Sequence, residues 1–171
     1  MIFISGIHGV GKSYFCNIVK EKLGIKSYSA STLIAEAKKQ SFSPDKLVSD
    51  IDENQLYLLA AVNRLRESDE NFILDGHFCL LNTDGKVVRI GVETFTTLKP
   101  DTIILLTEKP EVIAARRKER DGVELNLSEI QHFQNAETLY AQEVAQLLGA
   151  KLKISAGSSD LDATIDFIQS L

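Results

Sequence analysis

Only two cysteines, Cys16 and Cys79, occur among the 171 residues. That number is too small for the disulfide framework of a secreted protein, so a reducing, cytoplasmic location is expected. No apolar run is as long as a membrane span, and the short apolar start lacks a basic leader, so neither a signal peptide nor a membrane partner is expected. The formal net charge of −5 argues against a nucleic-acid partner, because phosphate neutralisation needs a concentrated basic face.

Internal repeats, low-complexity tracts and linkers are also missing, which predicts one domain over residues 1–171. Apolar, β-prone runs alternate with segments that carry apolar residues at helical spacing. The strand candidates are residues 1–5, 25–30, 71–78, 101–107 and 151–155, and Asp84-Gly85 predicts a hairpin within residues 80–90. Strands separated by helices indicate an α/β fold with a parallel sheet covered on both faces.

Residues 6–13, with the sequence GIHGVGKS, fit the whole pattern G-x-x-x-x-G-K-[ST] of a phosphate-binding P-loop. A predicted strand precedes them and a predicted helix, residues 12–24, follows them. Glycines let the backbone curl around a phosphate, and the helix N-terminus adds positive potential. Lys12 can neutralise the β- and γ-phosphates, and the Ser13 hydroxyl can bind Mg²⁺. The alternative is a glycine-rich turn with a surface lysine.

Asp75 and His77 lie near the end of the strand candidate at 71–78. In open α/β folds, ligands bind beyond the carboxyl ends of the strands, so both side chains can face the P-loop. Asp75 could hold a Mg²⁺-bound water, and His77 could orient an acceptor or a water. Alternatively, Asp75 only caps the strand and His77 makes an ordinary surface hydrogen bond.

Arginines gather near the end of the helix predicted at residues 110–122. Arg116 and Arg120 are four residues apart and share one face, which suits a phosphoryl group in transfer. Arg117 shares the adjacent face with Asp121, and we expect these two residues to form a local ion pair. The alternative is a solvated basic face at a helix C-terminus.

Together these motifs resemble the nucleoside-monophosphate kinase branch of P-loop proteins, particularly archaeal-type adenylate kinases and CINAP-like adenylate kinase/ATPases. The D-x-H pattern at Asp75 and His77 and the arginine-rich segment carry the resemblance beyond the P-loop. It implies a three-layer fold with sheet order 2-3-1-4-5, a helical acceptor-binding insert at about 31–68 and a short arginine lid at about 116–125. It also implies ATP and Mg²⁺ as cofactors, with Gly157 beside the adenine.

We therefore expect a kinase that transfers the γ-phosphoryl group of ATP to a nucleotide or a related small molecule. Arginine is missing near Asn54 and Gln55, where archaeal-type enzymes bind the acceptor, which argues against AMP. The alternatives are a nucleoside or metabolite kinase and a regulatory ATPase whose state a partner protein reads. The expected catalytic residues are Lys12, Asp75, His77, Arg116 and Arg120; the metal-binding residues are Ser13 and Asp75; the nucleotide-binding residues are Gly6, His8, Gly9, Val10, Gly11, Lys12, Ser13, Tyr14 and Gly157.

Overall fold

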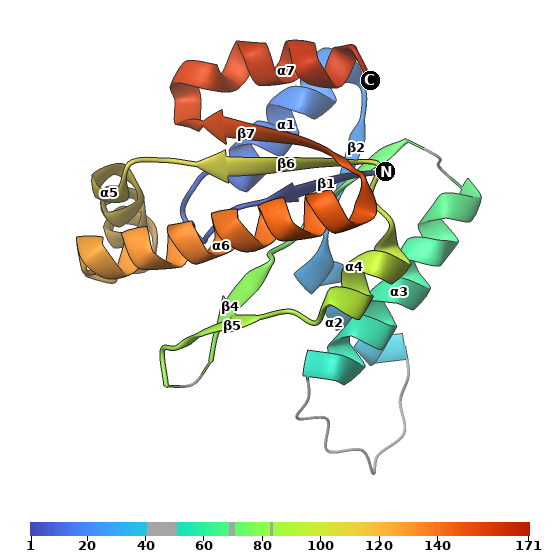
Figure 1. Cartoon of the computed structure of the whole chain (residues 1–171), viewed down its shortest axis with the longest axis horizontal. Helices are drawn as coiled ribbons and strands as arrows, with labels where there is room; N and C mark the ends of the chain where they lie inside the picture. The colour runs from blue at the N-terminus through green and yellow to red at the C-terminus, as the bar shows by residue number, and fades with distance from the viewer. Residues whose placement is uncertain (41–50, 69–70, 83) are drawn as a thin grey trace.

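The central sheet of the computed structural model consists of five parallel strands (Figure 1). The structure describes residues 1–40, 51–68, 71–82 and 84–171. The strands are β1 (Ile2–Ser5), β2 (Lys26–Ser29), β3 (Phe72–Asp75), β6 (Thr102–Thr107) and β7 (Lys151–Ala156). They lie in the order β2-β3-β1-β6-β7. When all seven described strands are numbered along the chain, the sheet order is 2-3-1-6-7 rather than the expected 2-3-1-4-5. The numbers differ because two strands that belong to another sheet, β4 and β5, precede β6.

Those two strands, β4 (Cys79–Leu81) and β5 (Val87–Arg89), pair antiparallel as a hairpin beside the sheet. The predicted turn lies between them, and Gly85 has a φ of 74°. The Asn82 Oδ1 atom accepts hydrogen bonds from the backbone N–H groups of Asp84, at 3.0 Å, and Lys86, at 2.8 Å. This hairpin packs against α6 (Leu127–Leu148).

Helices cover both faces of the sheet (Figure 1). One face carries α1 (Lys12–Leu23) and α7 (Leu161–Gln169), which follows the short 3₁₀ helix η1 (Gly157–Asp160). The other face carries α6 and α4 (Val92–Leu98). The remaining helix on the α6 side, α5 (Pro110–Asp121), begins with a proline and packs against α6.

The segment expected to form the helical insert contains α2 (Ala30–Gln40) and α3 (Ile51–Ser68), which pack against each other. Helix α3 also contacts α4, so the pair is attached to the α6 side of the molecule (Figure 1). Residues 41–50, which belong to the insert expected at about 31–68, lie outside the described residues.

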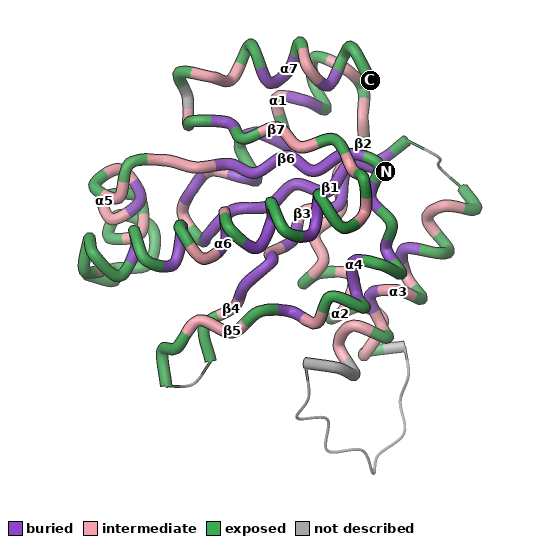
Figure 2. Tube along the Cα trace, viewed as in Figure 1, coloured by how far each residue is buried: buried purple, intermediate pink, exposed green. Residues whose placement is uncertain are grey.

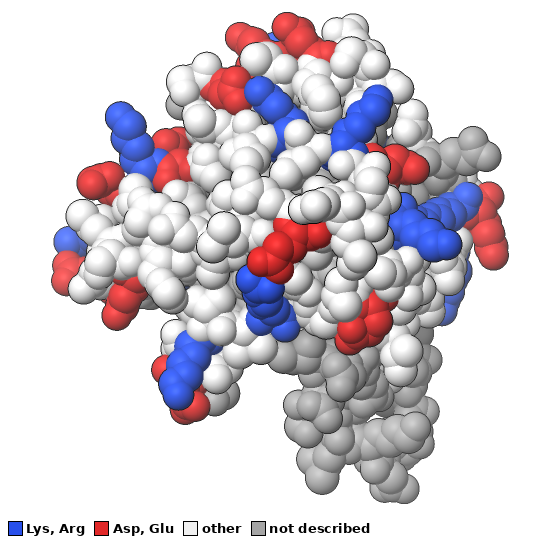
Figure 3. All heavy atoms as spheres, viewed as in Figure 1, with Lys and Arg blue, Asp and Glu red and all other residues white. Residues whose placement is uncertain are grey.

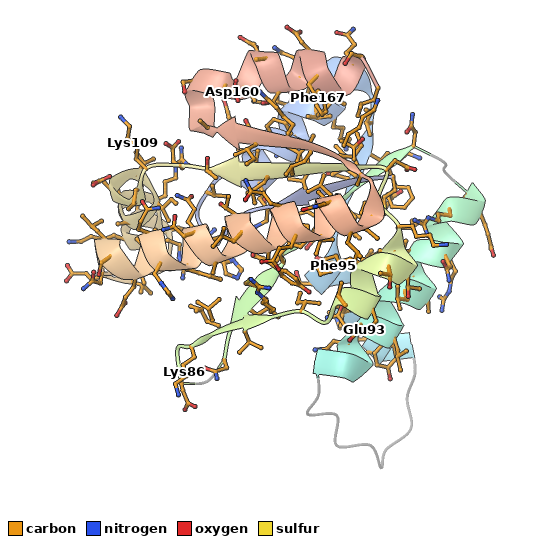
Figure 4. All side chains as sticks on the ribbon, viewed as in Figure 1. Lys86, Glu93, Phe95, Lys109, Asp160 and Phe167 are labelled. Atoms are coloured by element: carbon orange, nitrogen blue, oxygen red, sulfur yellow. The ribbon has the colours of Figure 1, made fainter. Side chains whose placement is uncertain are left out.

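The core follows the three inner strands β1, β3 and β6, which are buried along most of their length (Figure 2). Apolar residues run continuously in β1, β3 and β6 because helices cover both faces of the sheet. Phe95 of α4, labelled in Figure 4, packs edge-on against Phe3 of β1, with ring centroids 5.7 Å apart. Charged side chains of both signs are interspersed over the coloured part of the face in Figure 3. Among the described residues, no helix has the length and hydropathy needed to cross a membrane.

Candidate active site

The glycine-rich loop connects the end of β1 to the beginning of α1. Gly6 has a φ of 143°, and a Cβ atom added there would lie 2.6 Å from the carbonyl oxygen of Leu106. Gly9 and Gly11 also have positive φ angles, of 91° and 109°. Other residues adopt such conformations only at an energetic cost, so glycine allows the tight curl. The curl ends at the N-terminus of α1, where backbone N–H groups favour an anion. The loop therefore fits the phosphates of a nucleotide.

Lys12 begins α1, and its side chain is almost completely buried. Its Nζ atom donates a 2.6 Å hydrogen bond to the carbonyl oxygen of Gly6 and lies 3.1 Å from His77 Nε2. The same atom is 3.9 Å from Asp75 Oδ1. Burial lowers the pKa of Lys12, and the Asp75 carboxylate opposes this shift. The lysine is thus held at the centre of the site between the loop and the end of β3.

Asp75 and His77 come from the carboxyl end of β3, beside β1. Asp75 lies opposite Ile4 in the sheet, and Gly76 donates a 2.9 Å hydrogen bond to the Ile4 carbonyl oxygen. Burial raises the pKa of Asp75, whereas the charge of Lys12 lowers it. Burial, followed by the positive charge of Lys12, lowers the pKa of His77 to about 3. His77 is therefore uncharged near neutral pH, and its Nε2 atom can accept a hydrogen bond from the Lys12 ammonium group.

The arginines lie in the last turns of α5, and Gly122 ends this helix. Arg116 Nη1 donates hydrogen bonds to the carbonyl oxygens of Val10, at 2.9 Å, and Gly9, at 3.4 Å. Arg120 Nε and Nη2 contact the two carboxylate oxygens of Asp121 at 2.7 and 2.8 Å. The expected lid segment is thus the end of a helix and its exit, and Arg116 already contacts the loop.

Arg117 forms the expected ion pair with Asp121, with 2.6 Å between Nε and Oδ2. Its side chain is only 22% exposed. Its stem also lies against the loop, because a Cβ atom added at Gly9 would be 2.9 Å from Arg117 Cγ. Arg117 therefore supports the loop by packing in addition to its ion pair with Asp121.

Oxygen ligands for a metal ion are available at Ser13 and Asp75. Within residues 1–40, 51–68, 71–82 and 84–171, no group of three or more His, Cys, Asp or Glu side chains could hold a metal ion. Mg²⁺ is usually held by one or two protein oxygens together with substrate phosphates and water. An exposed hydroxyl and a half-buried carboxylate beside a phosphate loop fit this preference.

A cavity of about 850 Å³ connects the loop with the space between α2, α3 and α4. Its phosphate end is lined by His8, Gly9, Gly11, Lys12, Ser13, Tyr14, Asp75, His77, Arg116 and Arg120. Three residues expected to contact the nucleotide are not in this lining. Gly6 and Val10 belong to the loop but are buried on the side away from the cavity. Gly157 lies against Glu108, whose carboxylate is 3.5 Å from the Arg116 guanidinium.

Sequence reasoning missed Glu137, which is 1% exposed on the buried face of α6. Its carboxylate accepts hydrogen bonds from the Ser5 hydroxyl and from the backbone N–H groups of Phe78, at 2.9 Å, and Cys79, at 2.6 Å. Burial raises the pKa of Glu137, and the three hydrogen bonds oppose the shift. The signal in the sequence was an acidic residue within the apolar stripe of a long helix. Glu137 connects the end of β1 to the segment that carries His77.

Gln134, one turn earlier on the same face of α6, makes a similar connection to the end of β6. Its Oε1 atom accepts a 3.0 Å hydrogen bond from the Glu108 N–H group, and its Nε2 atom donates a 2.9 Å bond to the Glu108 carbonyl oxygen. Two polar residues of one buried helix face therefore hold three strand ends around the cavity.

Replacement of Glu137 by leucine should lower the free energy of unfolding by about 3 kcal/mol, because two buried N–H groups and a hydroxyl lose their acceptor. Urea denaturation followed by circular dichroism measures the change. The control is Glu129→Leu, an exposed substitution in the first turn of the same helix, which should cost less than about 1 kcal/mol. Equal small losses in both variants would contradict the connecting role of Glu137.

A curled loop between a parallel strand and a helix, with a buried lysine at its end, defines a P-loop nucleotide-binding protein. Residues 5–134 match the family model described as "AAA domain". The chain therefore belongs to this family.

Two curated relatives carry the name "Putative adenylate kinase". The one from Methanocaldococcus jannaschii is 27% identical over 122 residues, which is 70% of this chain and 58% of the relative. The one from Thermococcus onnurineus is 28% identical over 129 residues, 75% of this chain and 60% of the relative. The matches thus span about three fifths of the length of these relatives.

Solved structures of kinases share the fold. A sugar kinase from Janibacter sp. matches with a TM-score of 0.56 and 14% identity over 99% of this chain and 91% of that structure. A gluconokinase from Sinorhizobium meliloti matches with a TM-score of 0.55 and 16% identity over 96% of this chain and 86% of that structure. At these identities the likeness concerns the fold alone.

Proposed function

We propose that the protein is a Mg²⁺-ATP-dependent kinase that transfers a phosphoryl group to a small molecule. The observation that carries this proposal is the continuity of the cavity, which leads from the phosphate loop past Asp75 into a second compartment between α2, α3 and α4. A phosphoryl transfer needs the donor phosphate and the acceptor side by side in one water-poor site. The names of the curated relatives support the same class of reaction.

The roles of the residues follow from their positions. The loop N–H groups and Lys12 would bind the phosphates, and Arg116 and Arg120 would stabilise the charge that develops during transfer. Ser13 would hold Mg²⁺ directly and Asp75 would hold it through a bound water, so that the Asp75 carboxylate stays available to the acceptor; Mg²⁺ when bound neutralises phosphate charge. The uncharged His77 would keep Lys12 Nζ directed toward the loop through their 3.1 Å contact.

ADP release by a coupled assay tests the proposal. With Mg²⁺ and ATP, at least one acceptor from a panel of nucleosides, nucleoside monophosphates and sugars should raise the rate at least tenfold over the rate without acceptor. Omission of Mg²⁺ is the control and should abolish the increase. A steady rate that no acceptor changes would contradict the kinase proposal and favour a regulatory ATPase, with water as the acceptor.

A further inference from the structure

We propose that the acceptor is an uncharged nucleoside, whose hydroxyl group meets Asp75 while its flat body lies between α2, α3 and α4. This inference rests on the kinase function proposed above and specifies the occupant of the second compartment. It is carried by the chemistry of the compartment walls, the position of the cations and a buried amide group without a partner.

The walls of the second compartment are mainly hydrocarbon. Helices α2, α3 and α4 and the hairpin region contribute Ile34, Leu58, Leu80, Ile90, Phe95 and Leu98. The polar side chains among them are those of Ser29, Ser31, Lys38, Asn54, Gln55 and Thr94. A polyhydroxylated sugar would leave several hydroxyl groups without hydrogen bonds against these walls, which is costly. A planar base joined to one sugar ring buries more apolar surface against these walls.

The cations that line the cavity lie mostly at its phosphate end. Lys12, Arg116 and Arg120 surround the loop, where the donor phosphates would use their charges. Within the described residues, the remaining cation in the lining is Lys38 of α2. It lies eight residues beyond Ala30, which neighbours Gly76, and is therefore about 12 Å farther along the helix axis. The reacting end of the acceptor would meet the Asp75 carboxylate, which repels a second phosphate.

Three arginines that could have held an acceptor phosphate are placed elsewhere. The Arg66 guanidinium donates to the carbonyl oxygen of Leu98, a residue of the wall, but Arg66 itself is not part of the cavity lining. Arg89 binds both carboxylate oxygens of Glu143, at 2.5 and 3.0 Å, and lies over the Tyr140 ring. Arg64 is exposed on α3 and is not part of the lining.

Asn54 adds a positive indication of what the compartment binds. Its Oδ1 atom is buried and has no hydrogen-bond partner within the described part of the chain. Asn54 and its neighbour Gln55 both line the cavity from α3. A buried amide oxygen normally has a donor, and the amide of asparagine offers both an acceptor and a donor group. Because this oxygen has almost no solvent-exposed area, the Asn54 side chain would turn toward the cavity to meet the complementary pair of groups at the edge of a nucleobase.

The reaction with such an acceptor balances without a further reagent. The hydroxyl proton passes to the Asp75 carboxylate, and the hydroxyl oxygen forms a bond to the γ-phosphorus of ATP. The bond from this phosphorus to the bridging β,γ-oxygen breaks, and the electron pair leaves with ADP. The products are a nucleoside monophosphate, ADP and the proton held on Asp75.

Matched pairs of nucleosides and their 5′-monophosphates test the inference, with adenosine, guanosine, cytidine and thymidine and product detection by mass spectrometry. At least one nucleoside should be phosphorylated with a kcat/KM at least tenfold above that of its monophosphate. A preference for the monophosphates, or equal use of both, overturns the inference and leaves the kinase function standing. No product from any pair, with ADP release unaffected by every acceptor, overturns both.

A substitution in the wall gives a second test. Gln55→Arg should lower nucleoside use at least tenfold and shift the preference toward the monophosphate, because it adds a cation to the wall of the second compartment. The control is Leu56→Arg, which adds the same charge on α3 at a residue that is 67% exposed. It should leave both substrates unchanged. Equal effects of the two variants would overturn the proposed placement of the acceptor.

Binding gives a readout that does not depend on turnover. Isothermal titration calorimetry of the preferred nucleoside in the presence of ADP should show affinity about tenfold weaker in Asn54→Leu than in the unmodified protein. Asn63→Leu, an exposed substitution on the same helix, is the matched control and should bind as the unmodified protein does. Unchanged affinity in Asn54→Leu overturns the assignment of this amide to the acceptor.

Discussion

Acceptor-dependent ADP release should fall about a thousandfold when Lys12 is replaced by methionine, because the phosphates lose the cation that the loop holds at their centre. Methionine keeps much of the buried stem and removes the ammonium group. The melting temperature should change little, because the loss of the hydrogen bond to Gly6 and of the contact with Asp75 opposes the gain from removing a buried charge. Steady-state kinetics and a thermal melt on the same preparation measure both effects.

Lys20→Met is the matched control for this variant, because Lys20 is exposed on the same helix. Its activity and melting temperature should equal those of the unmodified protein. If Lys12→Met retained full activity, the kinase proposal and the ATPase alternative would both fail. If instead its melting temperature collapsed, the loss of activity would reflect unfolding rather than lost charge.

The second large effect is expected for Asp75→Asn, which should lower kcat at least about a hundredfold while the affinity for ATP changes little. Asparagine has the shape of aspartate but neither its charge nor its capacity to receive a proton. The loss should therefore appear during transfer rather than in ground-state binding of the nucleotide. Separate measurements of kcat and of the Kd for ATP distinguish the two.

Asp84→Asn in the exposed turn of the β4–β5 hairpin controls for the removal of one negative charge. Asp84→Asn should change neither kcat nor the Kd for ATP. Should Asp75→Asn alter only the melting temperature, Asp75 would be a structural cap of β3, the alternative that the sequence left open.

The features that the sequence predicted are those whose determinants are contiguous. The eight residues from Gly6 to Ser13 carry the whole loop motif, and the apolar run before Asp75 shows where β3 ends. The hairpin was predictable because Asp84 and Gly85 lie between two β-prone runs. In each case the residues that determine the local structure are adjacent in the sequence, so their pattern can be recognised without knowledge of the fold.

Features that depend on distant contacts were not predictable in the same way. β2 gave a weak signal because it is a partly exposed edge strand with a polar sequence. Helical spacing predicted the pair between Arg117 and Asp121, but not the packing of Arg117 on Gly9 or the contact of Arg120 with the same carboxylate. The partners of Glu137 are about 60 and 130 residues away in the chain, so no local pattern identifies them.

The contacts of Gln134 and Glu137 fix the number of residues between these two positions of α6, but they do not fix the residue at which the helix ends. Gln134 holds the end of β6, and Glu137 holds β1 and the segment after β3. One residue inserted between them would rotate the second contact by about 100° around the helix axis, so both could not form together. After Leu148 the chain turns at Gly149, where added residues would leave both contacts in register. Insertions and deletions among related sequences should therefore be excluded between these two residues and tolerated at the end of the helix.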